Sequence, residues 1–327
     1  MNSSILQIEN LTTEFQTVTH KTHAVEGLSL TLQKNEILGV AGESGCGKSV
    51  TILSVLRLLP PNGTIRRESK ILYQGLDLTR IPENEMNSLR GKDLSIVFQE
   101  PMGSFNPLFP VGKQIVEVIR THEPEVPLKQ ALERAIELFR QVRIPHPELR
   151  IQDYPFQFSG GMLQRALIAL SLACSPQILF ADEPTTALDA STQIGILDLL
   201  LERKEATGMS IFFVSHDLSL LSGISDRICV LYAGRMVEAC TAKELHSHPL
   251  HPYTQDLLEA VPRKGTFKKE RRLYSIQGKV PDPQNRPLGC KYHPRCSKAF
   301  DRCRKEEPEL YGKDSHWVRC WLYADAH

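Results

Sequence analysis

Residues Phe158 to Asp189 read FSGGMLQRALIALSLACSPQILFADEPTTALD. The stretch opens with Ser159-Gly160-Gly161, continues into an apolar Ala/Leu-rich segment, and after Pro176 enters a short apolar strand that ends in Asp182-Glu183. A helix N-terminus behind glycines binds anions, because its free N–H groups and its dipole point at the ligand. A carboxylate pair at the end of a buried strand suits Mg²⁺ and a water nucleophile. Both ends of this stretch therefore indicate a site for a phosphate ester.

The composition is that of an ordinary globular protein of 327 residues, with 41% hydrophobic and 24% charged residues. The net charge of +1 argues against a protein that binds nucleic acid through bulk charge. From Arg263 onward the chain carries sixteen Lys and Arg against eight Asp and Glu, which indicates a domain boundary near residue 262. There is no signal-peptide pattern and no apolar run of membrane-spanning length, so we expect a cytosolic chain whose membrane role is peripheral.

A second phosphate motif precedes the opening stretch. The apolar run Ile37–Ala41 is typical of a strand covered on both faces, and we expect a helix over Val50–Leu59, stopped by two prolines. Between them the sequence matches G-x-x-x-x-G-K-[ST] in full, as Gly42, Glu43, Ser44, Gly45, Cys46, Gly47, Lys48 and Ser49. The glycines let the backbone wrap a diphosphate, Lys48 reaches the β- and γ-phosphates, and Ser49 ligates Mg²⁺.

The remaining pattern is mostly α/β. We expect strands over Ile5–Phe15 and Ala24–Leu32. Residues 70–99 read as mixed strand and loop, ending in a short strand Ser95–Gln99 that would leave Gln99 beside a turn. Residues 103–157 instead place apolar side chains at helical spacing, which predicts a helical insert. After Asp189 we expect a helix over Ser191–Ala206 and further strands over Ser210–Val214, Arg227–Tyr232 and Arg235–Glu238. Helices over 241–247 and 253–260 follow. His216 directly follows the first of these later strands, a position where a lone His is more often a capping or packing residue.

Taken together and in this order, these elements resemble the ATP-binding-cassette (ABC) ATPases over residues 5 to about 262. The resemblance implies an α/β fold of the ABC-type P-loop class, with a mixed-sheet core, an antiparallel β subdomain and a helical subdomain over about 103–175. It also implies an ATPase domain over residues 1–262, followed by a basic linker and a small Cys-rich C-terminal region over 263–327.

The resemblance assigns a role to each motif in one chain's own ATP site. Phe15 would stack on adenine, and the backbone from Gly42 to Val50 would hold the phosphates. Asp182 would hold Mg²⁺ together with Ser49 and Gln99. Glu183 would be the general base that polarises the attacking water, and His216 would contact the γ-phosphate. The chemistry is consistent with these roles, because phosphoryl transfer depends on positioning and on charge neutralisation.

Other motifs would serve the ATP of a second ATPase chain. Ser159, Gly160 and Gly161 would contact the γ-phosphate held by the opposite subunit, so that ATP is sandwiched between two chains, and Asp189 would lie in a loop that crosses the dimer interface. The motif reads FSGGM where LSGGQ is commonest in the family, and Cys46 occupies a position that is usually Ser or Ala. We interpret Cys46 as a small tolerated residue, with oxidation sensitivity as the alternative. No catalytic residue is replaced, so we expect an active ATPase.

Four cysteines cluster late, at Cys290, Cys296, Cys303 and Cys320. Their spacing is neither that of a zinc ribbon nor that of a ferredoxin, so spacing alone indicates four soft ligands for an unspecified metal. Four unliganded thiols are the plain alternative. The resemblance favours a [4Fe–4S] cluster over Zn²⁺, with stapling of the tail as its role and redox sensing as the alternative.

Three segments narrow the resemblance to one branch of the family. PMGSFNPLFPVGKQI at 101–115, HPLHPYTQDLLEAVP at 248–262 and GCKYHPRCSKAFDRC at 289–303 resemble the dipeptide/oligopeptide importer ATPases. The related nickel and glutathione importers share these features, so the substrate stays open.

We therefore expect an ATP-hydrolysing subunit at the cytoplasmic face of the membrane. Its partners would be a second, different ATPase chain, two transmembrane permeases and, indirectly, an extracytoplasmic binding protein. A soluble ABC ATPase acting on ribosomes or DNA is the alternative class, but the chain has no long coiled-coil insertion and only one cassette.

Overall fold

The structure is a computed structural model that describes residues 4–18, 20–186, 188–260, 275–313 and 315–324. The chain forms two compact units whose segments interleave along the sequence. Unit 1 contains Gln33–Glu36 and Arg80–Phe213, and unit 2 contains Ser4–Leu32, Ile37–Thr79 and Val214–His327. The predicted boundary at residue 262 lies outside the described residues, so the predicted domain division stays a prediction.

The first sheet of unit 2 has the strand order β2-β1-β5-β6, with β4 paired to β1. Its strands are β1 (Ser4–Gln16), β2 (Lys21–Gln33), β4 (Gly63–Ile65), β5 (Lys70–Tyr73) and β6 (Leu76–Asp77). The pairs β1·β4, β1·β5 and β5·β6 are antiparallel. Leu28 and Leu32 in β2 are fully buried, while the side chains between them are partly or fully exposed. The predicted strands over 5–15 and 24–32 are thus confirmed.

A second set of strands in unit 2 follows the order β12-β13-β11-β10-β3. They are β3 (Ile37–Ala41), β10 (Arg227–Tyr232), β11 (Arg235–Thr241), β12 (Tyr311–Lys313) and β13 (His316–Val318). β10 runs parallel to β3, whereas β11, β13 and β12 follow antiparallel, so this part of the sheet is mixed. Every residue of β3 is buried, as its continuous apolar sequence predicts.

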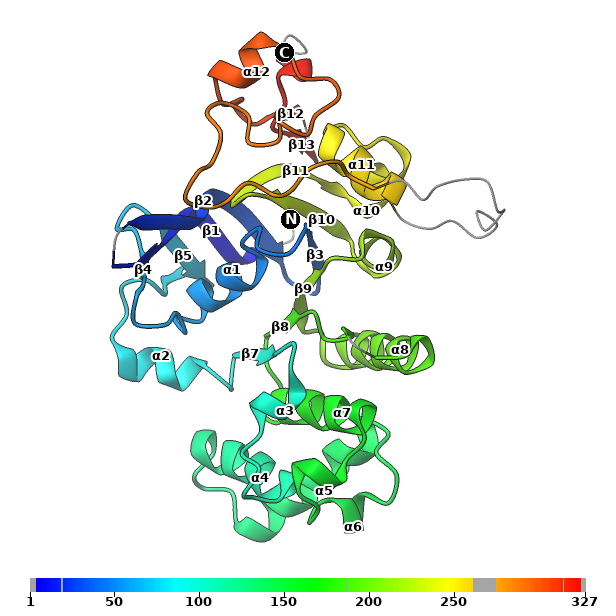
Figure 1. The fold of residues 1–327 in the computed structure, drawn as a ribbon. Helices are drawn as coiled ribbons and strands as arrows, with labels where there is room; N and C mark the ends of the chain where they lie inside the picture. The colour runs from blue at the N-terminus through cyan, green and yellow to red at the C-terminus, as the bar shows by residue number, and fades with distance from the viewer. Residues whose placement is uncertain (1–3, 19, 187, 261–274, 314, 325–327) are drawn as a thin grey trace. The chain divides into compact units, whose positions relative to one another are not determined.

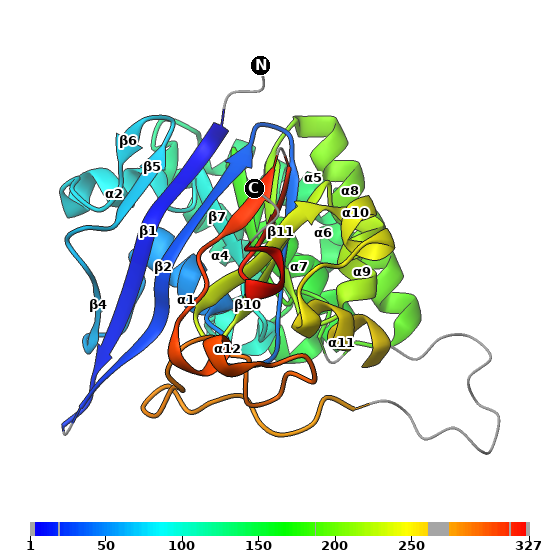
Figure 2. The ribbon, with the colours of Figure 1, turned by 90° about the horizontal axis from the view of Figure 1, so that it is seen from above.

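Short helices complete unit 2. They are α1 (Lys48–Val55), α9 (Leu218–Ile224), α10 (Ala242–Ser247), α11 (Pro252–Ala260), α12 (Asp301–Lys305) and the 3₁₀ turn η2 (Trp321–Tyr323). The described residues 275–313 and 315–324, called the C-terminal segment below, supply β12 and β13 and run alongside β11 (Figure 2).

Glu238 of β11 anchors this C-terminal segment. Its side chain is fully buried, and its carboxylate accepts hydrogen bonds from the backbone N–H groups of Leu250 (2.7 Å) and His251 (2.9 Å). The same carboxylate lies 2.8 Å from Nε2 of His316 in β13. A buried carboxylate without partners would be strongly destabilising, so β11, the turn before α11 and β13 are held in one arrangement.

Unit 1 combines two parallel strands, β7 (Leu94–Val97) and β8 (Ile178–Asp182), with the start of β9 (Ser210–Ser215), which runs on into unit 2. Its helices are α2 (Glu83–Leu89), α3 (Pro101–Ser104), α4 (Val111–His122), α5 (Leu128–Gln141), α6 (Pro147–Arg150), α7 (Gly160–Ser171) and α8 (Ala190–Thr207), with a 3₁₀ turn η1 (Pro155–Gln157). α4, α5 and α7 pack against one another (Figure 1). The predicted helical insert is confirmed.

The apolar stripe predicted for this insert is the face that packs. Ile115, Ile119, Ala131, Ala135 and Phe139 are all fully buried. Two neighbours from the same pattern, at positions 118 and 138, are only partly buried, because they lie at the edge of the stripe. Prolines cap two of these helices, at positions 110 and 127, where the fixed φ suits the start of a helix.

Some elements differ from the predicted ones. The strand predicted to end at Glu238 continues to Thr241 as β11. The helix expected over Val50–Leu59 is α1, Lys48–Val55, and it ends early because Arg57 takes a left-handed φ of 52° before the two prolines. The strand expected to reach Gln99 ends at Val97. Residues 83–89, expected as strand and loop, form α2. None of the helices among the described residues combines the length and apolarity that a membrane span requires.

We predict that Gly112→Ala destabilises the protein by about 2 kcal/mol, because overpacking a filled site costs energy. A Cβ at Gly112 in α4 would lie 2.3 Å from Cγ1 and 2.4 Å from the carbonyl oxygen of Ile151. Gly103→Ala in α3 is the matched control, because a Cβ there meets nothing within 4 Å. That variant should be neutral or slightly stabilising. Urea unfolding followed by circular dichroism measures both, and equal midpoints would contradict the packing described.

Candidate functional site

The loop Gly42–Ser49 joins β3 to α1 in unit 2, as predicted. Its backbone requires glycine at two places. Gly42 has φ 149°, and a Cβ there would lie 2.3 Å from the carbonyl oxygen of Leu231. Gly47 has φ 106°, and its Cβ would lie 2.8 Å from the carbonyl oxygen of Ala24. The loop is thus pressed against β10 and β2 with no room for side chains at these positions.

Lys48 begins α1 and is buried, with 5% of its surface exposed. Its ammonium group donates to the carbonyl oxygens of Gly42 (2.7 Å) and Glu43 (3.2 Å), so the side chain folds back along the loop. Cys46 in the same loop is also buried, and burial raises the pKa of its thiol. A buried thiol with a raised pKa is poorly reactive, which favours the interpretation of Cys46 as a packing residue over oxidation sensitivity.

Two other predicted residues lie in unit 2. Phe15 is in β1, opposite Gly63 of β4, and is partly buried. His216 is exposed and directly follows β9. The next residue, Asp217, caps α9 by accepting from the N–H groups of Ser219 (2.9 Å) and Leu220 (3.1 Å). This cap fixes the backbone beside His216, so the capping role falls to Asp217.

In unit 1 the carboxylate pair lies where the sequence predicts it. Asp182 is the last residue of β8 and is buried, with 8% exposed. Glu183 has a left-handed φ of 47°, an uncommon conformation for a residue with a side chain. Its carboxylate accepts a hydrogen bond from the hydroxyl of Thr186 (2.9 Å). Strained backbone of this kind is found at functional sites, where the surrounding structure holds it in place.

The glycine motif and Asp189 are brought together in the same unit. Ser159 caps α7, with its hydroxyl accepting from the N–H of Met162 (3.3 Å), and is exposed. Asp189 caps α8 by accepting from the N–H of Thr192 (3.0 Å), and its hydrogen bonds to Ser191 and Thr192 lower the pKa of its carboxyl group. A Cβ at Gly161 would lie 2.8 Å from Cγ2 of Thr192, so the two helix starts pack against each other.

Gln99 lies two residues beyond β7 and is exposed. The residues around it are unusually apolar for a surface, with exposed fractions of 36% for Phe98, 55% for Met102 and 77% for Leu108. Gln114 fixes the following loop, because its side chain bonds to the backbone N–H (2.9 Å) and C=O (3.0 Å) of Asn106.

The four late cysteines are all free thiols and line one small cavity in unit 2. Burial raises the pKa of Cys290 to about 11 and that of Cys320 to about 12. Nearby thiolates add to both shifts, and for Cys320 these are the other three cysteines. His293, between the first two cysteines, directs Nδ1 to the carbonyl oxygen of Cys290 (2.9 Å).

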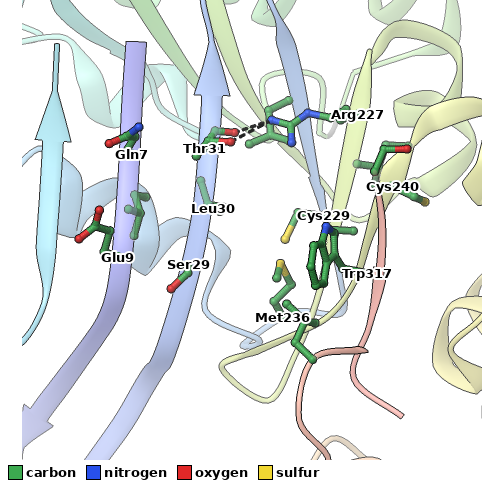
Figure 3. Close-up of a pocket in the computed structure, with 16 residues that line it drawn as sticks. Gln7, Glu9, Ser29, Leu30, Thr31, Arg227, Cys229, Met236, Cys240 and Trp317 are labelled. Carbon is green, nitrogen blue, oxygen red and sulfur yellow. Dashed lines mark hydrogen bonds between the residues drawn. The ribbon is translucent and has the colours of Figure 1, made fainter. Parts of the chain in front are cut away.

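A larger cavity of about 430 Å³ opens in unit 2 among β1, β2, β10, β11 and β13 (Figure 3). Leu30, Cys229, Met236 and Trp317 are among its described lining residues, and none of the predicted site residues lines it. The cavity is therefore separate from the predicted site.

One contact of the phosphate loop was not expected from the sequence. The carboxylate of Glu43 forms an ion pair with Arg295 (2.6 Å), and its backbone N–H donates to the hydroxyl of Tyr253 (2.9 Å). The only sequence signal was an acidic residue inside a loop that is built for anions. Its partner lies 252 positions away and could not be identified from spacing.

Comparisons with known proteins support the fold and the family. The model of the ABC transporter family matches residues 25–186, and that of the oligopeptide/dipeptide transporter C-terminal region matches residues 237–303. A probable peptide ABC transporter ATP-binding protein of Sinorhizobium fredii is 41% identical over 320 residues, covering 97% of this chain and 94% of its own. The dipeptide transport ATP-binding protein DppD of Haemophilus influenzae is 42% identical over 317 residues, covering 97% and 95%.

Solved structures give the same fold. A dimeric ATP-binding cassette bound to ADP and Pi superposes with a TM-score of 0.65 at 24% identity, over 72% of this chain and 98% of that one. The protein cbiO1 of Clostridium perfringens gives a TM-score of 0.63 at 22% identity, over 76% and 92%. The expected ABC-type α/β fold is confirmed, and the near full-length matches establish that the chain belongs to the ABC ATPases, in the branch of the dipeptide/oligopeptide importer ATP-binding proteins.

Proposed function

We propose that this chain binds and hydrolyses ATP to power the import of peptides through a membrane transporter. The observation that carries the proposal is the strand–loop–helix at 37–55. In its loop, Gly42 and Gly47 take backbone conformations that favour glycine, and the loop leads into the N-terminus of α1 at Lys48. The N-terminus of α1, with its helix dipole, and the Lys48 ammonium suit the β- and γ-phosphates. Peptides are the proposed cargo because the relatives carry peptide or dipeptide transport in their names.

The predicted residues divide into two groups: those that would act on the ATP bound by this chain, and those that would face the ATP bound by a second ATPase chain. Asp182, with Ser49 and Gln99, would hold Mg²⁺, whose charge offsets that of the phosphates when it is bound. Glu183 accepts a proton from the attacking water, and His216 and Phe15 would contact the γ-phosphate and the adenine. Ser159, Gly160, Gly161 and Asp189 would face the ATP of a second ATPase chain. The exposure of Ser159 and Asp189 supports this role, because residues that meet a partner must be accessible.

We predict that Glu183→Gln retains ATP binding and lowers turnover by about a hundredfold to ten-thousandfold, the usual effect of losing a general base. The substitution keeps the side-chain oxygen that accepts from Thr186, so the local fold should persist. Glu205→Gln, at an exposed position in α8, is the matched control and should hydrolyse ATP normally. Phosphate release by the assembled transporter measures turnover. Unchanged turnover in Glu183→Gln would remove the assignment of this residue as the base.

The apolar residues near Gln99 are the proposed contact with a permease. Phe98, Met102, Leu108 and Phe109 are exposed within twelve positions of one another, which is more apolar surface than a short stretch usually leaves in water. The ammonium nitrogen of Lys113 lies 4.3 Å from the ring centre of Phe109. The side chain of Gln114 holds the loop before α4 by donating to the carbonyl oxygens of Asn106 and Phe109. These apolar side chains, exposed close to Gln99 along the chain, would transmit a movement of the ATP site to a permease and hold the chain at the membrane peripherally.

We predict that Leu108→Glu weakens retention of the chain on membranes that contain the permeases and leaves its ATP binding intact. Leu108 is 77% exposed, so a charge there is tolerated in the free chain but would be desolvated in a contact. Leu288→Glu is the control, because Leu288 is 81% exposed and lies in the C-terminal segment. Sedimentation with membranes measures retention. Equal retention of both variants would place the contact elsewhere.

We further propose that Cys290, Cys296, Cys303 and Cys320 hold a [4Fe–4S] cluster, with Zn²⁺ as the alternative. Four free thiols converge on one cavity, and soft thiolates suit either metal. The resemblance of the sequence to the importer ATPases is what favours the cluster over zinc, and its contribution would be to staple a segment with a small core.

We predict that Cys303→Ser removes most of the bound iron and the visible absorbance of anaerobically purified protein. Cys174→Ser is the control, because Cys174 is a free, half-buried thiol in unit 1. Iron, sulfide and zinc are counted per chain. Stoichiometric zinc in a colourless wild-type protein would establish the alternative metal, and the absence of both metals would leave four unliganded thiols.

A further inference from the structure

The C-terminal segment reaches the phosphate loop through Arg295, the residue directly before Cys296. Nη1 of Arg295 donates to one carboxylate oxygen of Glu43 (2.6 Å) and Nη2 donates to the other (3.1 Å). The Arg295 side chain is only 4% exposed, whereas that of Glu43 is 29% exposed. A bidentate pair of this kind fixes both the position and the orientation of the carboxylate.

Further contacts hold Arg295 in that position. Its Nε donates to the carbonyl oxygen of Gln277 (2.9 Å), and its guanidinium lies 5.8 Å from the ring centres of both Tyr232 and Tyr292. The arginine is therefore oriented before any ligand arrives. It can fix the loop, because it is itself fixed on more than one side.

The backbone of Glu43 is held as well as its side chain. Its backbone N–H donates to the hydroxyl of Tyr253 (2.9 Å), a fully buried residue of α11. The ring of Tyr253 packs 4.6 Å from that of Tyr232 and 5.2 Å from that of Tyr292, measured between ring centres. Backbone and side chain of one loop residue are thus both attached to the region that follows β10.

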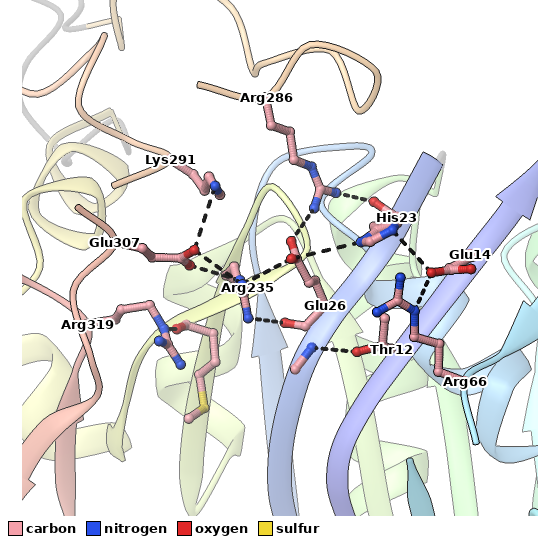
Figure 4. Close-up of polar contacts among 12 residues, drawn as sticks. Thr12, Glu14, His23, Glu26, Arg66, Arg235, Arg286, Lys291, Glu307 and Arg319 are labelled. Atoms are coloured by element: carbon pink, nitrogen blue, oxygen red, sulfur yellow. Dashed lines mark hydrogen bonds and ion pairs between the residues drawn. The ribbon is translucent and has the colours of Figure 1, made fainter. Parts of the chain in front are cut away.

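An ion-pair network secures the C-terminal segment on unit 2 (Figure 4). Glu26 of β2 pairs with Arg286 (3.3 Å) and with Arg235 of β11 (3.1 Å). Glu307 pairs with Arg235 (2.9 Å) and with Lys291 (3.6 Å). Arg295 is therefore presented by a segment that is attached at several points.

The charge of Glu43 gives this contact a functional consequence. A carboxylate one residue after Gly42 adds negative charge to a loop that must receive a polyphosphate, and like charges at short range repel strongly at low dielectric. Arg295 neutralises this charge and draws the carboxylate toward the C-terminal segment.

We propose that Arg295 is a positioning residue for ATP: it orients and neutralises Glu43, and thereby makes the phosphate affinity of the loop depend on the folded C-terminal segment. The inference rests on the proposed role of Gly42–Ser49 as the phosphate site. It assigns Arg295 no contact with ATP. Its effect passes through Glu43, and by linkage bound ATP would stabilise the attachment of the segment to the same degree.

The test is a double-variant cycle in the full chain, purified anaerobically with its metal content measured. Mg-ATP affinity is determined by titration calorimetry for the wild type, Arg295→Ala, Glu43→Gln and the double variant. We expect Arg295→Ala to weaken ATP binding by about tenfold, which corresponds to 1.4 kcal/mol. Glu43→Gln alone supplies the reference for the double variant, because it removes the carboxylate charge that Arg295 neutralises. The double variant should recover most of the lost affinity, because the unpaired charge has been removed.

Two control variants distinguish a failure of this inference from a failure of the proposed function. Arg302→Ala removes another arginine of the C-terminal segment, one that is 50% exposed and pairs with Glu306, and should bind ATP normally. Lys48→Ala tests the phosphate site itself: normal ATP binding in that variant would refute the proposed function. Loss of binding in Lys48→Ala together with unchanged binding in Arg295→Ala would overturn only this inference.

If Arg295 only stabilises the fold, the same experiments give a different outcome. In that case Arg295→Ala would lose iron or zinc and thermal stability, and Glu43→Gln would not restore ATP affinity. Hydrogen exchange of the peptide that contains residues 42–49 gives a second readout without nucleotide. Faster exchange in Arg295→Ala at wild-type metal content supports the proposal, and unchanged exchange contradicts it.

Discussion

The contacts of the buried Glu238 carboxylate hold together the part of unit 2 that surrounds β11. Two backbone N–H groups, from Leu250 and His251, and the ring of His316 meet on this one side chain. A charge without water must be satisfied by the protein, so the turn before α11 and strand β13 cannot move away from β11 without a large cost. One side chain thus joins the ATPase sequence to the C-terminal segment that follows it.

Several contacts with the phosphate loop follow from this attachment. α11 begins beside the anchored turn and presents Tyr253 to the backbone of Glu43, while the C-terminal segment presents Arg295 to its side chain. The proposed metal site lies in the same neighbourhood, because His251 borders the cavity that the four cysteines line. Stability of the segment and geometry of the loop are therefore parts of one physical arrangement in unit 2.

In unit 1 the corresponding interactions are the N-terminal caps of the consecutive helices α7 and α8. Ser159 and Asp189 satisfy the first N–H groups of α7 and α8, and Gly161 lets Thr192 approach closely. Since caps are recognisable in sequence, the helix starts in this unit could be predicted, and the buried faces of α4 and α5 followed from their 3.6-residue period. The errors, such as α2 and the end of β7, occurred in short elements where no such local signal exists.

The sequence by itself determined the family, the order of the motifs and the local geometry of the phosphate loop, because glycine positions, helix caps and apolar periodicity act over a few residues. It also showed four cysteines clustered near the C-terminus, and their binding of a metal stays a prediction. Tertiary structure alone decided that the C-terminal segment adds strands next to β11, that Glu238 anchors it, and that Arg295 neutralises Glu43. These contacts join residues far apart in the chain, and a long-range ion pair leaves no periodic trace in the sequence.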